Sequence, residues 1–296
     1  MKTEHVKKIA VLGGTGMAGH VVAIYLSELG YDVYTASRSS GNTPNSRSID
    51  ATDITAINEW LDEIKPDVVV NSIGVLQKQS DARPDLAVLL NSYLPLMIAQ
   101  KYINTPVKLI HLSTDCVFSG SRGGYVESDI PDGTTNYDRS KAMGEVKNNK
   151  DLTFRMSIVG PDRHRDGTGL LNWFMQQNGH IRGFTKALWN GVTTIELARA
   201  IGEAIRQNLS GLYQLTPNEI IDKYHLLLLF KEIFNKTDTE IIPFDGFATD
   251  KTLINTRNDF NFEIRSYRYQ VEDMKKWVDG HSALYGEYYF KSNKNI

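Results

Sequence analysis

Along the first half of the chain, apolar residues occur in two patterns: short continuous runs, and positions spaced three or four residues apart. Short apolar runs predict buried parallel strands, and stretches with apolar positions three or four apart predict helices. The predicted strands are residues 6–12, 31–36, 48–53, 66–71 and 107–112, and the helices between them are residues 17–29, 54–64 and 85–102. This alternation predicts an α/β fold with a Rossmann-like, doubly wound parallel sheet.

The second half has a less regular pattern. It opens after Pro161 with a polar, glycine-bearing loop and continues as helices joined by short connections. The predicted helices are residues 170–177, 195–207, 219–234 and 271–278, with a strand at 211–215 and a mixed segment at 239–257.

Charge and composition exclude several classes of function. The 296 residues include 33 Lys and Arg and 35 Asp and Glu, and no basic stripe indicates a nucleic-acid partner. The longest apolar run, 21–26, is too short to span a bilayer, and no signal-peptide pattern is present. We therefore expect a cytoplasmic protein without a membrane partner. The single cysteine, Cys116, excludes an intramolecular disulfide and a multi-cysteine metal site, so no metal is expected.

A glycine turn joins the first predicted strand to the first helix. It reads Gly13-Gly14-Thr15-Gly16-Met17-Ala18-Gly19, within a strand–turn–helix–strand unit of about thirty residues. We expect Gly14 to permit the tight turn, Gly16 to admit a pyrophosphate close to the backbone, and Gly19 to let helix and strand pack closely. The alternative is a glycine-rich turn that binds no ligand; the flanking elements favour a dinucleotide.

The end of the second strand selects between the two nicotinamide dinucleotides. An acidic residue there would hold a ribose 2′-hydroxyl, whereas an arginine suits a 2′-phosphate. The stretch after Ala36 carries Ser37, Arg38 and Ser39 and no carboxylate. This predicts NADPH in preference to NADH, which remains an alternative, as does a solvated loop arginine. Asp50 is expected at the adenine edge, or equally in a plain strand-end turn.

Tyr137 and Lys141 are four residues apart and therefore share one face of a helix. An ammonium beside a phenol favours the phenolate and lowers the phenol pKa. The pair is a candidate proton donor for a carbonyl that is reduced to an alcohol. Alone the spacing is common by chance, so its meaning depends on the glycine turn and on Ser113-Thr114-Asp115 at the end of another strand.

Together these features resemble the extended short-chain dehydrogenase/reductase family, and within it the sugar-nucleotide reductases of the dTDP-4-dehydrorhamnose reductase type. The residues that carry the resemblance are the glycine turn 13–19, Asp50, Asn71, Asn91, the block 113–118, Tyr125, Glu127, Asp129 and the segment 137–145. The resemblance implies that Thr114 hydrogen-bonds the substrate carbonyl, that Tyr137 protonates it and that Lys141 holds the nicotinamide ribose.

The resemblance also implies two sets of binding residues. The expected cofactor contacts are Gly13, Gly14, Thr15, Gly16, Met17, Gly19, Ser37, Arg38, Asp50, Ala51, Asn71, Ser72, Ile73, Asn91, Tyr137 and Lys141. The expected substrate contacts are Val75, Asp115, Cys116, Ile158, Asn172 and Arg182, and further candidate donors to a diphosphate are Arg163, Arg165 and Lys186. Each of these cationic candidates has the alternative of being a solvated surface residue.

The family architecture implies an NAD(P)-binding domain at residues 1–160. A smaller α/β substrate-binding region would cover 161–296, with residues about 187–210 returning to the first domain. Two positions depart from the family pattern: Cys116 replaces a usual tyrosine, and Ile158 replaces a usual tryptophan. Both border the sugar pocket in the relatives, so the identity of the sugar and of its nucleotide stays open.

The expected function is NADPH-dependent reduction of a keto group on a nucleotide-linked sugar, in deoxysugar or surface-polysaccharide biosynthesis. One alternative is an epimerase or dehydratase of the same superfamily that retains NAD. The other is a non-catalytic regulatory subunit of the methionine adenosyltransferase type. The aromatic C-terminal tail can pack on the body or on a second subunit, which leaves a homodimer open.

Overall fold

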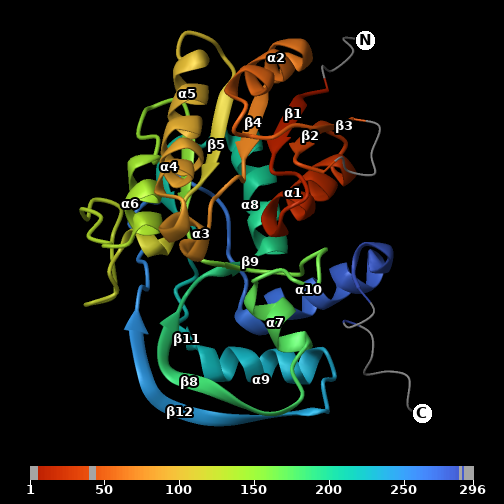
Figure 1. Ribbon diagram of the computed structural model, residues 1–296, viewed down its shortest axis with the longest axis vertical. Coiled ribbons are helices and arrows are strands. Elements are labelled where there is room, and N and C mark those ends of the chain that lie inside the picture. Colours follow the sequence, from red (N-terminus) through yellow and green to blue (C-terminus); the bar gives the residue numbers. More distant parts are fainter. Residues whose placement is uncertain (1–5, 40–44, 287–288, 290–296) are drawn as a thin grey trace.

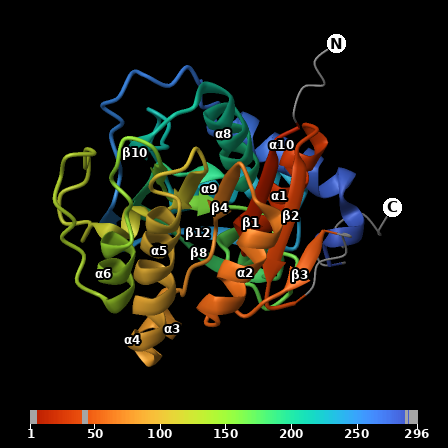
Figure 2. The same cartoon turned by 90° about the horizontal axis from the view of Figure 1, so that it is seen from above.

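The computed structural model describes residues 6–39, 45–286 and 289, and contains a large parallel sheet and a smaller sheet beneath it (Figures 1 and 2). The strands are β1 Lys8–Leu12, β2 Asp32–Ser37, β3 Ser46–Ser48, β4 Val68–Asn71, β5 Lys108–Leu112, β6 Leu152–Arg155, β7 Ile158–Val159, β8 Gly179–Trp189, β9 Val192–Thr193, β10 Gly211–Gln214, β11 Ile221–Asp222 and β12 Thr239–Asp250. The α-helices are α1 Met17–Glu28, α2 Ile54–Ile64, α3 Gln77–Ala82, α4 Pro84–Ala87, α5 Leu94–Lys101, α6 Asn136–Met143, α7 Leu170–Met175, α8 Thr194–Gln207, α9 Lys223–Ile233 and α10 Tyr267–Gly280. The helical turns η1 Val88–Tyr93, η2 Asp115–Val117 and η3 Ser282–Leu284 complete the described elements.

The large sheet is doubly wound, as predicted. Its seven strands lie in the order β10-β6-β5-β4-β1-β2-β3, and every pairing between neighbours is parallel. The chain winds from β1 to β3 in one direction and from β4 to β10 in the other. The winding therefore reverses between β1 and β4, where open α/β sheets bind ligands beyond the carboxyl ends of their strands.

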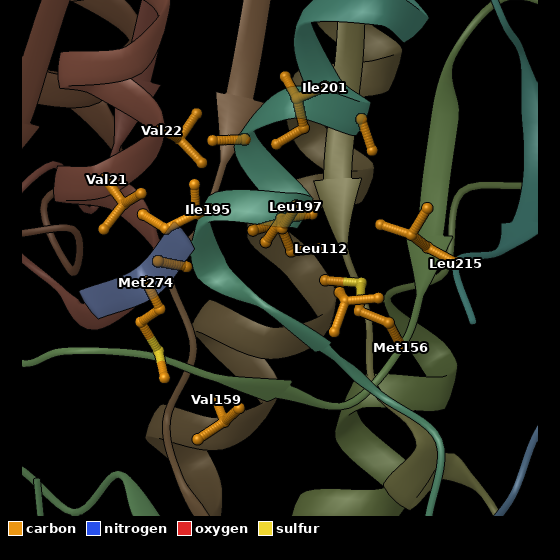
Figure 3. Close-up of a cluster of buried hydrophobic side chains, with 14 of the residues drawn as sticks. Val21, Val22, Leu112, Met156, Val159, Ile195, Leu197, Ile201, Leu215 and Met274 are labelled. Carbon is orange, nitrogen blue, oxygen red and sulfur yellow. The ribbon is translucent and has the colours of Figure 1, made fainter. Parts of the chain in front are cut away.

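Both faces of this sheet are buried, which explains the nearly continuous apolar strands. In β1, Ile9 and Val11 pack on the side of α1 and α8, whereas Ala10 and Leu12 pack on the side of α2 and α5. Figure 3 shows the first of these layers, in which Val21 and Val22 of α1 face Ile195, Leu197 and Ile201 of α8.

The second half of the chain contributes to both sheets. β10 pairs with β6 at the edge of the large sheet, and α8 packs against α1. The smaller sheet has the order β11-β8-β12 and is covered by α9 (Figure 1). The division of the chain at residue 160 into two domains stays a prediction.

Several predicted elements have different bounds in the structure. The segment predicted as one helix at 85–102 begins at Pro84 and contains a π-helical turn, η1, and a separate short helix, α3, precedes it. The long strands β8 and β12 were not predicted: the first lies in an unassigned segment, and the second in the segment expected to be mixed. The predicted helix 219–234 is shorter, because Ile221 and Asp222 pair with β8 before α9 begins.

A buried ion pair joins the large sheet to the segment after α6. Arg155 at the end of β6 donates two hydrogen bonds to Glu145, of 2.8 and 2.7 Å, and both side chains are inaccessible to solvent. The Arg155 guanidinium also lies 4.8 Å from the centroid of the Phe118 ring. Ser113, beside the candidate catalytic Thr114, donates to the same Glu145 carboxylate at 2.9 Å.

Replacing Arg155 should leave the buried Glu145 carboxylate with only a longer ion pair, to Lys147 at 3.5 Å. We expect Arg155→Leu to lower the free energy of unfolding by roughly 3–5 kcal/mol, and the double variant Arg155→Leu/Glu145→Leu to recover a substantial part of that loss. Urea denaturation of the three proteins measures both quantities. A double variant no more stable than Arg155→Leu would contradict the expectation.

Candidate active site

A pocket of about 380 Å³ lies at the carboxyl ends of β1, β2 and β4, where the winding reverses. Nine of the predicted cofactor residues line it: Gly13, Thr15, Gly16, Ser37, Arg38, Asp50, Ala51, Ser72 and Ile73. Val75, predicted as a substrate contact, lines the same pocket. The pocket therefore gathers residues from four separate strand ends at the place predicted for a dinucleotide.

The glycines of the turn have partly different roles from those predicted. The tight turn requires Gly13, whose φ is +82°, and not Gly14, where a Cβ would lie 2.6 Å from Cβ of Thr35 on β2. Gly19 packs as expected, because a Cβ there would lie 2.2 Å from the Gly13 carbonyl oxygen. At Gly16 a Cβ would meet only that same oxygen, at 3.4 Å, so its backbone faces the pocket.

The residues beyond β2 suit an anionic group. Arg38 is exposed at the pocket, next to Ser37, and its carbonyl oxygen accepts a hydrogen bond from Ser48 at 2.8 Å. Asp50 lines the pocket, but it also accepts two hydrogen bonds from Thr52, of 2.9 and 2.8 Å. These hydrogen bonds lower the pKa of the Asp50 carboxyl below its usual value, so it stays a carboxylate in a strand-end turn.

Two predicted cofactor contacts, Asn71 and Asn91, are fully buried and bind other parts of the protein instead. Asn71 accepts a hydrogen bond from the Ile73 amide at 3.1 Å and contacts His111 at 3.3 Å. Asn91, in the π-helical turn, accepts from the Val75 amide at 2.7 Å and donates to the Val75 carbonyl at 3.0 Å and to Ser140 at 3.0 Å. The structure therefore makes both amides supports of the pocket wall.

Two other predicted cofactor residues also lie behind the pocket: Gly14 against β2 and Gly19 against the turn. Met17 lies under the loop that precedes α7, since a Cβ on Gly169 would be 2.8 Å from its sulfur. Tyr137 and Lys141 are outside the lining and belong to α6.

The helix α6 holds the predicted catalytic pair. It begins at a capping box in which Thr135 accepts a hydrogen bond from the Asp138 amide and Asp138 accepts one from the Thr135 amide, both at 3.1 Å. Lys141, which is buried, donates to the Leu112 carbonyl at the end of β5 at 2.6 Å. Asn91 links Ser140 of this helix to Val75 in the pocket wall, which brings the catalytic pair beside the pocket.

Thr114 lies between the pair and an acidic side chain. Its hydroxyl donates to Asp115 at 3.1 Å, accepts from the Cys116 amide at 3.1 Å and is hydrogen-bonded to Tyr137. Thr114 and Tyr137 are thus neighbours; their role as two donors to one substrate oxygen stays a prediction.

The Tyr137 pKa is raised in this structure, opposite to the fall that was predicted from the nearby Lys141. Burial raises the pKa of the Tyr137 phenol above its ordinary value, and the hydrogen bond with Thr114 offsets only part of that rise. Burial also lowers the pKa of Lys141 to about 8. Near neutral pH the phenol is therefore protonated and the lysine is charged.

The predicted substrate residues do not all gather at this point. Asp115 and Cys116 flank Thr114, and burial raises the pKa of the Cys116 thiol to about 12, which argues against a nucleophilic thiolate. Ile158 pairs with Val192 in the short β7–β9 sheet, directly after Ser157. Arg182 is exposed on β8, and its guanidinium lies 4.5 Å from the Phe244 ring centroid.

Asn172 organises a loop and does not offer its amide to a ligand. It is fully buried and donates to the carbonyl oxygens of His164, Arg165 and Gly167 at 3.3, 3.1 and 2.7 Å. That loop brings His164 into the lining of the cofactor pocket, which sequence reasoning missed because it assigned the loop to the substrate side. Arg163 and Arg165 lie in the same loop, and Lys186 pairs with Asp245 on the exposed face of β8.

A chain of buried hydrogen bonds holds the glycine turn from behind. Trp277 of α10 donates to the Tyr285 hydroxyl at 2.7 Å, Tyr285 is 3.0 Å from Nε2 of His20, and Nδ1 of His20 is 2.8 Å from the Gly16 carbonyl oxygen. Burial lowers the pKa of His20 to about 4, so the ring is neutral and donates from Nδ1 while Nε2 accepts from Tyr285. The aromatic tail, where it is described, thus packs on the body; the predictions for residues 287–288 and 290–296 lie outside the described residues.

Among the described residues, no helix has the length and apolar character that a membrane crossing needs. No cluster of three or more His, Cys, Asp or Glu side chains among those residues is arranged to hold a metal ion.

The doubly wound sheet, its glycine turn and the Thr114–Tyr137–Lys141 set define the extended short-chain dehydrogenase/reductase class. Within that class, the chain belongs to the RmlD substrate binding domain family, whose sequence model matches residues 7–276.

Among similar curated proteins, the probable low-salt glycan biosynthesis reductase Agl14 of Haloferax volcanii is 33% identical over 157 residues, which make up 50% of this chain and 52% of that protein. This match thus spans about half the length of that relative. Methionine adenosyltransferase 2 subunit beta of Xenopus laevis is 22% identical over 251 residues, 80% of this chain and 75% of that protein. The solved structure of dTDP-4-dehydrorhamnose reductase from Bacillus anthracis in complex with NADP has a TM-score of 0.78 at 19% identity and covers 93% of this chain and 100% of that one.

Removing the Tyr285 hydroxyl should weaken the glycine turn's support. We expect Tyr285→Phe to leave Nε2 of His20 and the Trp277 indole unpaired, at a cost of roughly 1–3 kcal/mol in unfolding free energy. Binding of NADPH, used as a probe of the pocket, should weaken several-fold. Fluorescence titration and thermal melts measure the two effects.

Tyr102→Phe is the matched control, because the buried Tyr102 hydroxyl has no hydrogen-bond partner among the described residues. This variant should lower neither the free energy of unfolding nor the affinity for NADPH. Equal behaviour of the two variants would contradict the supporting role of Tyr285.

Proposed function

We propose that this protein is an NADPH-dependent reductase of a keto group on a nucleotide-linked sugar. The observation that carries the proposal is the meeting of Thr114 and Tyr137 beside the pocket at the carboxyl ends of the strands, with Lys141 one helical turn away. The glycan biosynthesis reductase among the relatives supports a role in deoxysugar or surface-polysaccharide synthesis.

The pocket fits the proposed dinucleotide. The glycine turn leaves open backbone at Gly16 at the N-terminus of α1, where unpaired N–H groups and the positive end of the helix dipole attract a pyrophosphate. Arg38 offers a charged fork to a ribose 2′-phosphate. NADPH, when bound, supplies the hydride for the carbonyl carbon.

The protein's own side chains then protonate the substrate carbonyl oxygen and stabilise its developing charge. Tyr137, kept protonated by burial, releases its proton to the alkoxide that forms. Thr114 turns its hydroxyl proton from Asp115 towards the same oxygen and stabilises the developing charge. Lys141 uses one N–H for the Leu112 carbonyl, which leaves its others for hydroxyls of the nicotinamide ribose.

Tyr137→Phe tests the assignment of the acid. The variant should retain NADPH affinity and lose about 10²–10⁴-fold in turnover, because the phenyl ring keeps the packing but has no proton to give. Turnover is followed by NADPH absorbance with dTDP-, UDP- and GDP-linked keto sugars. Activity within a factor of ten of wild type would remove Tyr137 from this role.

Arg38→Ala tests the choice of cofactor. Loss of a charge-assisted contact to the 2′-phosphate should lower the preference for NADPH over NADH by about tenfold or more, through the KM for NADPH alone. Arg47→Ala is the control, because Arg47 is half exposed on β3 and pairs with Glu63. The same preference in wild type and Arg38→Ala would contradict the proposal.

The match to methionine adenosyltransferase 2 subunit beta over 80% of this chain supports a second candidate function, that of a regulatory subunit. Co-purification of a larger catalytic partner, with no NADPH oxidation on any keto-sugar nucleotide, would support it. Retained nucleotide and turnover without added cofactor would instead indicate an epimerase.

A further inference from the structure

The ammonium of Lys223 is an unsatisfied cation beside the candidate active site. Lys223 opens α9, is partly buried, and its Nζ lies 4.5 Å from the centroid of the Trp189 ring. Within the described part of the chain this ammonium makes no hydrogen bond and no ion pair within 4 Å. An ammonium carries three donors, so all three are available.

Other buried lysines of this protein are satisfied. Lys108 donates to Asn208 at 2.8 Å, Lys141 to the Leu112 carbonyl at 2.6 Å, and Lys236 to Asp238 at 2.8 Å. Contact with the Trp189 ring stabilises the Lys223 ammonium, but it fills none of the three donor positions. The three buried lysines are thus satisfied by the protein, whereas partly buried Lys223 keeps its donors for water or a ligand.

The surroundings of Lys223 place it on the substrate side of Thr114. Its strongest charged neighbour is the Asp115 carboxylate, which partly offsets the fall of the Lys223 pKa to about 8 that burial causes. The Trp189 indole beneath it donates to Ser157 at 2.8 Å, next to Ile158 in the predicted sugar pocket. Lys223 and Trp189 both come from the second half of the chain, opposite Thr114 and Tyr137.

A second lysine faces the same carboxylate. Lys251 follows β12 and acts on Asp115 even more strongly than Lys223 does. Asp115 already accepts a hydrogen bond from Thr114. Two ammonium groups therefore act on the one Asp115 carboxylate. Ammonium groups gathered in this way attract an anion.

We propose that Lys223, together with Lys251, binds an anionic oxygen group of the substrate next to the Thr114–Tyr137 pair. The group is either the diphosphate of a sugar nucleotide or a carboxylate on the sugar itself; in both cases the ammonium donates charge-assisted hydrogen bonds to it. This inference rests on the proposed function, because it takes the reacting carbonyl to lie at Thr114 and Tyr137.

Calorimetric titration of the NADP⁺-loaded protein tests it without requiring turnover. The probes are uridine, UDP, dTDP, UDP-glucose and UDP-glucuronate, and the proteins are wild type, Lys223→Met, Lys223→Arg and Lys231→Met. Lys231 lies about two turns further along the same helix and serves as the control. Circular dichroism and thermal melts establish that each variant is folded.

Lys223→Met should weaken binding of the recognised anion by at least about tenfold, Lys223→Arg should restore most of it, and Lys231→Met should behave as wild type. If the anion is the diphosphate, UDP or dTDP and the sugar nucleotides all weaken while uridine does not. If the anion is a sugar carboxylate, Lys223→Met loses affinity for UDP-glucuronate but not for UDP-glucose.

Unchanged affinities in Lys223→Met, or no binding of any anionic probe by wild type, would overturn the inference. The two proposals fail separately. If anion binding depends on Lys223 but no keto-sugar nucleotide is reduced, the reductase proposal fails and the anion site stands. If NADPH is oxidised but Lys223→Met binds every anion like wild type, the anion site fails and the reductase proposal stands.

Discussion

The candidate site depends on the hydrogen bonds of the buried Asn91 side-chain amide. This side chain binds both the amide and the carbonyl of Val75 in the pocket wall and, on its other side, Ser140 of the catalytic helix. A π-helical turn carries Asn91, and turns of this kind depart from regular helix geometry at sites where a side chain must be placed. Asn91 therefore connects a wall of the pocket to the helix that carries Tyr137 without being one of the residues that line the pocket.

The first half of the fold followed from the sequence because its signals are local. Apolar runs buried on both faces, a glycine turn and a Tyr–Lys spacing of four each reflect geometry within a few residues. Nine predicted cofactor residues accordingly line one pocket. The roles of Gly13 and Gly14 were harder to separate, since only the packing of Gly14 on Thr35 of another strand distinguishes them.

The failures concern long-range contacts. The residues next to Asn71, Asn91 and Asn172 in the sequence do not show that these side-chain amides form hydrogen bonds with other parts of the protein. The strands β8 and β12 escaped prediction because much of each lies exposed and lacks a regular alternation. The Tyr137 pKa moves opposite to the prediction because the phenol is buried, which the helix spacing does not reveal. Lys223 reaches the site only through the tertiary fold.

The hydrogen-bond chain from Tyr285 to His20 has a consequence for synthesis of the protein. Its two ends are 265 residues apart, yet one of them holds the Gly16 carbonyl in the first loop of the chain. During translation the glycine turn is made long before Tyr285 and lacks this support until the segment that carries Tyr285 has followed it. A chain cut before Tyr285 would therefore leave the turn without the hydrogen bond that holds His20 in place.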